Sequence, residues 1–118
     1  MDIRDLIQEG LAHFDAHEWE KAKEKFSNAQ ALDVRHPVPH FFLSLVFFAQ
    51  NNLEASRRSL AQGLALSPRN ALGQNIAALL AFREGKAKHG VMLLKQHGLA
   101  EHPRIQAFLL MEMEKQLI

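Results

Sequence analysis

The sequence contains no cysteine and no tyrosine, and it has little proline or tryptophan. Without cysteine there can be no disulfide framework, no thiolate nucleophile and no Cys-ligated zinc or iron–sulfur site. Long apolar runs are missing as well, because the longest stretch, residues 41–49, is interrupted by Ser44 and is too short to cross a bilayer. The N-terminus mixes acidic and basic residues and has no uninterrupted apolar segment behind it, so we expect no signal peptide.

Charge of neither sign dominates the 118 residues. Lys and Arg together number 14 and Asp and Glu together number 13, which gives a formal net charge of +1. Such a balance gives no global field that would favour nucleic acid or an anionic membrane surface. The 47% hydrophobic content is typical of a globular chain, and the length suits a single domain with its own core. We therefore expect one cytoplasmic domain that neither binds nucleic acid nor inserts into a membrane.

Seven histidines raise the question of a metal site. His13 and His17 are four residues apart, and so are His36 and His40. However, His17 falls at a predicted turn, His36 precedes Pro37 in a predicted loop, and the sequence places no third ligand beside either pair. There is also no glycine-rich phosphate loop and no recognisable nucleophile motif. We expect no catalytic residue, no metal, no cofactor and no enzymatic activity.

Helical periodicity dominates the chain, and turn signals divide it into seven segments of normal helix length. Self-comparison shows a repeat of about 34 residues, because residues of matching size recur at that interval. The matching columns are Gly10, Ser44 and Ala78; Leu11, Leu45 and Leu79; Phe14, Phe48 and Phe82; Trp19, Leu53 and Ala87; Ala22, Ser56 and Gly90; and Phe26, Leu60 and Leu94.

These columns resemble the tetratricopeptide repeat (TPR) family, whose helix–turn–helix unit has this length. The resemblance implies an all-α fold, a TPR-type α-solenoid in a right-handed superhelix, as one domain over residues 2–118. Its repeats would span about residues 3–36, 37–70 and 71–103, followed by a capping helix over 104–118. The third unit departs from the family pattern, since His97 occupies a small-residue position and Pro103 comes one residue late. Its second helix is therefore expected to be short or irregular.

In the TPR family the first helix of each repeat lines a concave groove that binds partner polypeptides. The corresponding positions here, all apolar except Asn75, are Ile7, Leu11, Phe14, Phe41, Leu45, Phe48, Asn75, Leu79 and Phe82. Two interpretations stay open for this stripe. The middle helix, apolar nearly all round, is either buried between its neighbours or part of an open apolar groove.

The best-known TPR binding mode holds a chaperone's C-terminal carboxylate with basic and amide side chains. The matching positions here are Ile7, Leu11, Phe42, Leu72 and Ile76, none of which can donate to a carboxylate. The resemblance therefore implies an apolar helix or extended protein segment as partner, bound by an adaptor or small chaperone. In size, repeat count and groove polarity, the chain is similar in outline to small TPR chaperones of type III secretion systems.

The C-terminal segment is more apolar than a cap with a polar outer side requires. Residues 107–111 are consecutively apolar, and the candidate self-association residues are Phe108, Leu109, Met111 and Met113. Three interpretations stay open: the helix packs against the third repeat, folds into the groove, or pairs with a second copy. In the last case the chain would be a homo-oligomeric scaffold, for example a homodimer.

Overall fold

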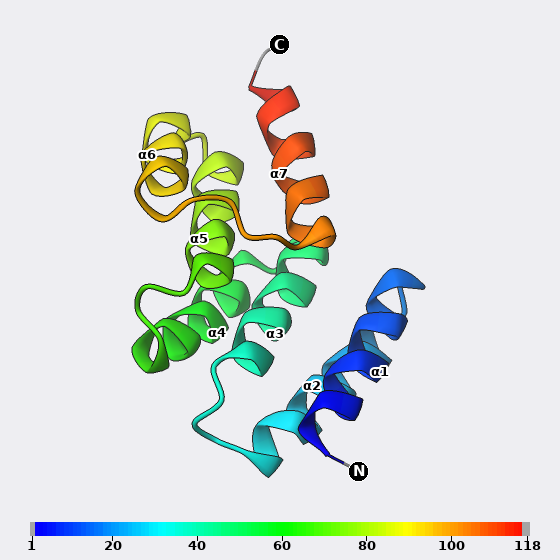
Figure 1. The fold of residues 1–118 in the computed structure, drawn as a ribbon. Helices are drawn as coiled ribbons and strands as arrows, with labels where there is room; N and C mark the ends of the chain where they lie inside the picture. Colours follow the sequence, from blue (N-terminus) through cyan, green and yellow to red (C-terminus); the bar gives the residue numbers. More distant parts are fainter. Residues whose placement is uncertain (1, 117–118) are drawn as a thin grey trace. The chain divides into compact units, whose positions relative to one another are not determined.

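The structure is a computed structural model that describes residues 2–116, and the regular elements of this part of the chain are all helices (Figure 1). The helices are α1 (Ile3–Asp15), α2 (Trp19–Leu32), α3 (Val38–Ala49), α4 (Leu53–Leu66), α5 (Ala71–Arg83), α6 (Ala87–His97) and α7 (Pro103–Lys115). For residues 2–116, the prediction of an all-α chain with seven helices is confirmed. The last two residues of the expected capping helix, 117 and 118, lie outside the described residues.

The chain divides between Leu66 and Ser67 into two compact units. The first unit contains α1 to α4, and the second contains α5, α6 and α7. Each expected repeat range holds one pair of adjacent helices that pack on each other, namely α1 with α2, α3 with α4, and α5 with α6. Whether residues 2–118 act as one domain stays a prediction.

Short polar and proline residues determine where several helices begin. Asp2 caps α1 in a reciprocal capping box, in which its carboxylate accepts from the Asp5 backbone N–H at 3.0 Å. Asn70 caps α5 by accepting from the Gly73 N–H at 3.2 Å. Pro103 opens α7 at a position where its missing N–H costs no hydrogen bond.

The same tight turn joins the two helices of each pair. Its central residue has a positive φ: 58° at His17, 59° at Asn51 and 80° at Gly85. In each turn the N–H of that residue donates to a phenylalanine carbonyl three positions earlier, with distances of 2.9–3.0 Å; the acceptors are Phe14, Phe48 and Phe82. The repeat seen in the sequence is therefore also a repeat of backbone geometry.

Within each pair, a glycine of one helix faces a phenylalanine of the other. The pairs are Gly10 with Phe26, Gly63 with Phe41, and Gly90 with Phe82. A Cβ on Gly10 would lie 2.5 Å from Phe26 Cε1, which is closer than packed carbon atoms approach. Small residues therefore set the distance between paired helices and let large aromatic rings fill the core.

The α3–α4 pair has a second close approach, made by two buried serines. Ser44 and Ser56 place their hydroxyl oxygens 3.0 Å apart, and each hydroxyl lies 2.8 Å from the other residue's carbonyl oxygen. Both side chains are fully buried, so these contacts satisfy polar groups that water cannot reach.

In the first unit, α3 also packs against α2. Three contacts join the two helices: the stacked rings of Phe26 and Phe42 at 5.4 Å, the Lys23 ammonium over the Phe47 ring at 5.3 Å, and Gln30 Nε2 at 2.7 Å from His40 Nδ1. The second helix of one pair thus contacts the first helix of the next along much of its length.

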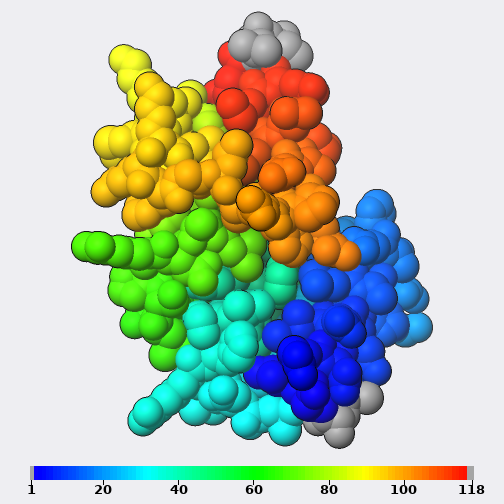
Figure 2. Space-filling model, viewed as in Figure 1, coloured from blue at the N-terminus to red at the C-terminus, as the bar shows by residue number. Residues whose placement is uncertain are grey.

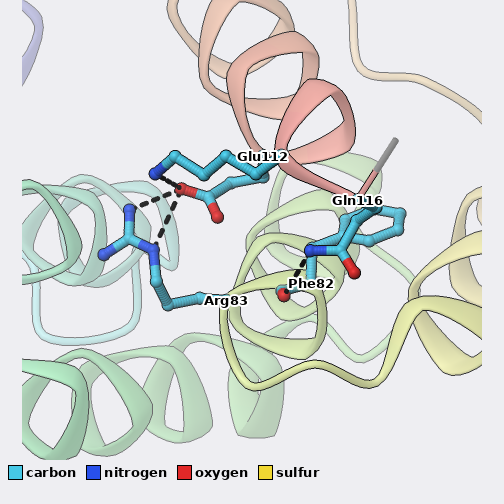
Figure 3. A network of polar contacts seen from close by, with 5 residues as sticks. Phe82, Arg83, Glu112 and Gln116 are labelled. Atoms are coloured by element: carbon cyan, nitrogen blue, oxygen red, sulfur yellow. Dashed lines mark hydrogen bonds and ion pairs between the residues drawn. The ribbon is translucent and has the colours of Figure 1, made fainter. Parts of the chain in front are cut away.

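In the second unit, α5 contacts both α6 and α7. The Arg83 guanidinium of α5 donates to Glu112 Oε1 of α7 from Nε at 2.9 Å and from Nη2 at 2.6 Å (Figure 3). One turn later, Gln116 Nε2 donates to the Phe82 carbonyl at 3.2 Å (Figure 3). These contacts, with the buried Ile105 and Leu109, hold α7 on α5.

Candidate functional site

The helix that follows a pair is placed differently in the two units. After the first pair, α3 packs on α2, the second helix of the pair. After the α5–α6 pair, α7 packs on α5, the first helix, and the described residues give no comparable packing of α7 on α6 (Figure 1). One side of the second unit is therefore left open between α6 and α7.

The early end of α6 accounts for this difference. With 11 residues it is the shortest of the seven helices, as its departure from the family pattern predicts, and it stops at Gly98 with a φ of 78°. Gly98 lies two 34-residue intervals after Gln30, which in α2 bonds His40 of α3. The last turn of α2, which contacts α3 through Gln30, thus has no equivalent in α6.

Asn75 holds the connection between α6 and α7 in place. Its amide donates to the Gly98 carbonyl at 2.8 Å and accepts from the Ala100 N–H at 3.1 Å. A third bond, to the Ala71 carbonyl at 2.8 Å, keeps the amide on α5. Because Asn75 is fully buried and its polar atoms are used internally, its role is to shape the linker that leads to α7.

The open side of the second unit is an apolar groove of about 620 Å³ between α6 and α7. In Figure 2 the two helices stand side by side, α6 in yellow to orange and α7 in orange to red. The α6–α7 groove is lined by Val91, Leu94, Lys95, Leu99, Gln106, Leu109, Leu110 and Met113. Of the described residues in this lining, only Lys95 is charged.

The α6–α7 groove of the second unit occurs at repeat positions where the first unit has a contact between α2 and α3. Two 34-residue intervals after Phe26 and Phe42, whose rings stack between α2 and α3, come Leu94 and Leu110 on opposite walls of the groove. The same interval carries Lys23 to Val91. The groove therefore presents apolar side chains at positions that α2 and α3 bury against each other.

Exposed apolar surface is concentrated at these helices. Six of the nine large exposed hydrophobic residues lie between positions 91 and 113: Val91, Met92, Leu99, Leu110, Met111 and Met113. Leu99 and Leu110 are each 61% exposed. Four of these six, Val91, Leu99, Leu110 and Met113, line the α6–α7 groove. Exposed apolar residues gathered around one groove mark interaction sites more often than scattered single residues do.

Glu112 of α7 is a buried carboxylate that faces α5 and does not line the groove. Burial by itself raises the pKa of Glu112, but hydrogen bonds from Arg83 and Lys115 outweigh it and hold that pKa below the ordinary value. The carboxylate therefore stays ionised and fixes the wall that α7 contributes. It does not face a ligand, since its bonds run to α5 and along α7.

The residues expected to line the TPR groove lie mostly in the core. Ile7 and Leu11 of α1 are partly exposed, whereas the other seven are buried: Phe14, Phe41, Leu45, Phe48, Asn75, Leu79 and Phe82. Of the two interpretations left open by the sequence, burial of the middle helix describes α3, in which eight of twelve residues are buried.

The candidate self-association residues divide between the core and the surface. Leu109 is buried and Phe108 is half-buried, while Met111 and Met113 are exposed. Met113 and Leu109 line the α6–α7 groove. Sequence reasoning did not select the groove residues Val91, Leu94 and Leu99, although the run of four apolar residues from Val91 to Leu94 in a short helix was a signal.

The described residues contain no group of three His, Cys, Asp or Glu side chains that could hold a metal ion. Within the same residues, each helix falls short of the length and apolar character that crossing a membrane demands. Neither a protein-family model nor a curated protein matches the chain. Its function is therefore inferred from the geometry of the α6–α7 groove.

Proposed function

We propose that this chain is a non-catalytic protein-binding module that holds an apolar helical segment of a partner protein in the α6–α7 groove. The observation that carries the proposal is that Leu94 and Leu110 face an open groove where their counterparts Phe26 and Phe42 stack. A partner helix would bury this surface as α3 buries that of α2. Such helix-in-groove recognition rests on apolar anchors three or four residues apart.

We also propose that the chain is organised as a TPR-type solenoid of three repeats and a capping helix. The proposal is supported by the positive-φ turn that recurs at His17, Asn51 and Gly85. It is supported as well by the small residues at the helix crossings, such as Gly10, Ser56 and Gly90. A binding role suits such a scaffold, because stacked repeats present surfaces rather than enclosed catalytic pockets.

The dimensions of the groove favour a short helix as occupant. The 11 residues of α6 span about 16 Å at 1.5 Å per residue, which is about three helical turns. The walls are built from leucine, valine and methionine, and Met113 can adjust its rotamers to different apolar side chains.

A defined probe tests the proposal: a fluorescent, amphipathic peptide of about 18 residues with a leucine stripe and glutamine on its other faces, helical over about five turns. We expect it to bind the full chain, as measured by anisotropy. On addition of the peptide, the largest changes in the protein's amide chemical shifts should fall in residues 91–99 and 106–113. Shift changes centred on α1 and α3 instead would contradict the proposed site.

Two matched variants make the test specific. Leu110→Lys places a charge on the groove wall, whereas Leu32→Lys makes the same change at a leucine of α2 that is 56% exposed and outside the groove. We expect Leu110→Lys to weaken probe binding about tenfold or more, since it removes one buried leucine contact. Leu32→Lys should leave binding unchanged, and equal effects of the two variants would count against the groove.

A second candidate function is self-assembly through the outer face of α7. Ala107, Leu110 and Met111 are exposed on that face, and Arg104 and Glu114 lie equally far from Leu109 along the chain. Two copies of α7 packed antiparallel about Leu109 would place the arginine of each beside the glutamate of the other, as a two-fold interface requires.

Light scattering of the purified chain tests self-assembly. A dimer mass that falls to a monomer mass in Met111→Lys, but not in the control Val34→Lys, would support it; Val34 is an exposed valine of the first unit. A monomer mass at all concentrations would exclude this candidate and leave the α6–α7 groove to a different protein.

A further inference from the structure

The lysines of this chain differ in whether they have a carboxylate partner. Five of the seven form ion pairs with N···O distances of 2.9–3.7 Å: Lys21, Lys23, Lys25, Lys86 and Lys115. Among the described residues, neither Lys88 nor Lys95 contacts a carboxylate. Both belong to α6, a helix without any acidic residue.

The positions of these two lysines relate them to the α6–α7 groove. Lys88, Val91 and Lys95 follow the i, i+3, i+7 spacing of one helical face, and Val91 and Lys95 line the groove. Lys88 does not line the groove itself, but it lies one turn before Val91 on the same helical face, so the two lysines flank this apolar position. Both lysines are exposed, so their charges are available to a bound chain.

The opposite wall does not neutralise this charge. Gln106, Leu109, Leu110 and Met113 of α7 carry no charge in the groove. The acidic residues nearest to the two lysines in the chain are Glu84, four residues before Lys88 and paired with Lys86 at 3.7 Å, and Glu101, in the linker before α7. Glu114 follows the last groove residue of α7, and none of these three lines the groove. Glu112 is already bonded to Arg83 and Lys115. The groove thus has one basic wall and one neutral wall.

We propose that the occupant of the α6–α7 groove is an amphipathic helix of a partner protein that carries carboxylates along one edge of its apolar stripe, paired with Lys88 and Lys95. This inference rests on the proposed function and specifies the chemistry of the partner. The apolar stripe fills the groove, and the acidic edge selects the partner and its orientation, because charge complementarity contributes more to specificity than to raw affinity.

The lysine spacing also specifies where the partner's carboxylates lie. Seven residues along α6 correspond to about 10 Å, or about two helical turns. A helix lying along α6 meets both ammonium groups with acidic residues seven positions apart on one side of the leucine stripe. Lysine at the same positions would place like charges together and weaken binding.

Three synthetic peptides test this pattern against the full chain. They share one leucine stripe and differ only at two edge positions seven residues apart, which carry glutamate, glutamine or lysine. At low salt we expect the glutamate peptide to bind about tenfold more tightly than the glutamine peptide, since two exposed ion pairs each contribute up to about 1 kcal/mol. The lysine peptide should bind most weakly, and high salt should bring the three affinities together.

A charge-reversed variant provides the decisive comparison. In the double variant Lys88→Glu/Lys95→Glu, the order of affinities should invert, so that the lysine peptide binds most tightly. The control is Arg58→Glu/Arg69→Glu, which changes the net charge equally at two exposed arginines outside the groove. We expect the control to keep the original order.

The outcomes separate this inference from the proposed function. Equal binding of all three peptides that is still weakened by Leu110→Lys would overturn the acidic-edge inference and leave the groove proposal standing. Binding of none of the peptides, or binding unaffected by Leu110→Lys, would overturn both. An order of affinities that inverts in Lys88→Glu/Lys95→Glu but not in the control Arg58→Glu/Arg69→Glu would support both.

Discussion

Arg83 and Glu112 form a two-pronged ion pair, in which the guanidinium of α5 reaches one carboxylate oxygen of α7 from both Nε and Nη2. The Glu112 side chain is only 3% exposed, whereas Arg83 is partly open to solvent. The pair therefore fixes the position of α7, and with it the width of the α6–α7 groove. It also explains why an acidic residue is tolerated on the side of α7 that faces α5.

Removing the arginine should loosen α7. In Arg83→Met the Glu112 carboxylate keeps only the Lys115 contact and stays buried, so we expect a loss of about 2 kcal/mol in the free energy of unfolding. Urea denaturation measures the loss, and Arg58→Met, at an exposed arginine of α4, is the control. The double variant Arg83→Met/Glu112→Leu should recover part of the stability; no recovery would mean that the pair acts by other contacts.

His40 should make stability depend on pH in the mildly acidic range. Burial lowers the pKa of His40 below its ordinary value of 6.5, while a hydrogen bond with Gln62 raises it less. Between the folded pKa and 6.5 the unfolded chain binds more protons, so His40 stabilises the fold above pH 6.5 and this contribution is lost as the pH falls through the folded pKa.

Two measurements check this pH dependence. The imidazole resonances of His40 should titrate with a midpoint below 6.5 in the folded protein. The free energy of unfolding should decline less between neutral and mildly acidic pH in His40→Gln than in the unsubstituted chain. A midpoint at or above 6.5 would contradict the prediction.

Adding one methyl group at Gly10 should destabilise the first helix pair. The Cβ of Gly10→Ala would lie 2.5 Å from Phe26 Cε1, so the buried ring or the helix must shift. We expect a loss of about 2 kcal/mol, despite the better helix propensity of alanine. The control Gln8→Ala, at an exposed position of the same helix, should be neutral, and Phe26→Leu should partly offset the loss in a double variant.

Asn75→Ala should release the linker between α6 and α7. The change leaves the Gly98 carbonyl and the Ala100 N–H without their partner, which predicts a loss of about 3 kcal/mol in the free energy of unfolding. Amide hydrogen exchange at Ala100 should accelerate more than the global loss explains. Asn28→Ala, at an exposed asparagine of α2, serves as the control, and unchanged exchange at Ala100 would contradict the role of Asn75.

The stability lost on substituting a turn residue should depend on how readily the new residue adopts the positive φ of that turn. Gly85 has a φ of 80° and no atom within 4 Å of a built Cβ, so Gly85→Val tests the backbone without a packing clash. We expect a loss of about 1–2 kcal/mol, because a branched side chain disfavours this conformation. Gly85→Asn should cost less, as Asn51 already occupies the same turn position. Equal losses for valine and asparagine would contradict this explanation.

The sequence by itself determined the local structure of this protein. Apolar periodicity defined seven helices, and the recurrence of Gly10, Ser44 and Ala78 indicated where paired helices approach each other. Caps, turns and small-residue contacts depend on neighbours within a few tens of residues, so a repeated pattern records them directly. The irregular end of the expected third repeat, residues 71–103, was visible too, since His97 and Pro103 depart from the pattern.

Only the tertiary structure decided which apolar residues are buried and which remain open. Phe48 and Leu110 are both apolar residues of helices rich in apolar side chains, yet the first is fully buried and the second mostly exposed. The difference arises because α6 ends early at Gly98, Asn75 holds the linker, and Arg83 draws α7 onto α5. These contacts do not recur at the 34-residue interval, because Phe41 takes the position of Asn75 and Ala49 that of Arg83 in the preceding helix pair. Neither the repeat nor a pattern of hydrophobicity along one helix therefore encodes them.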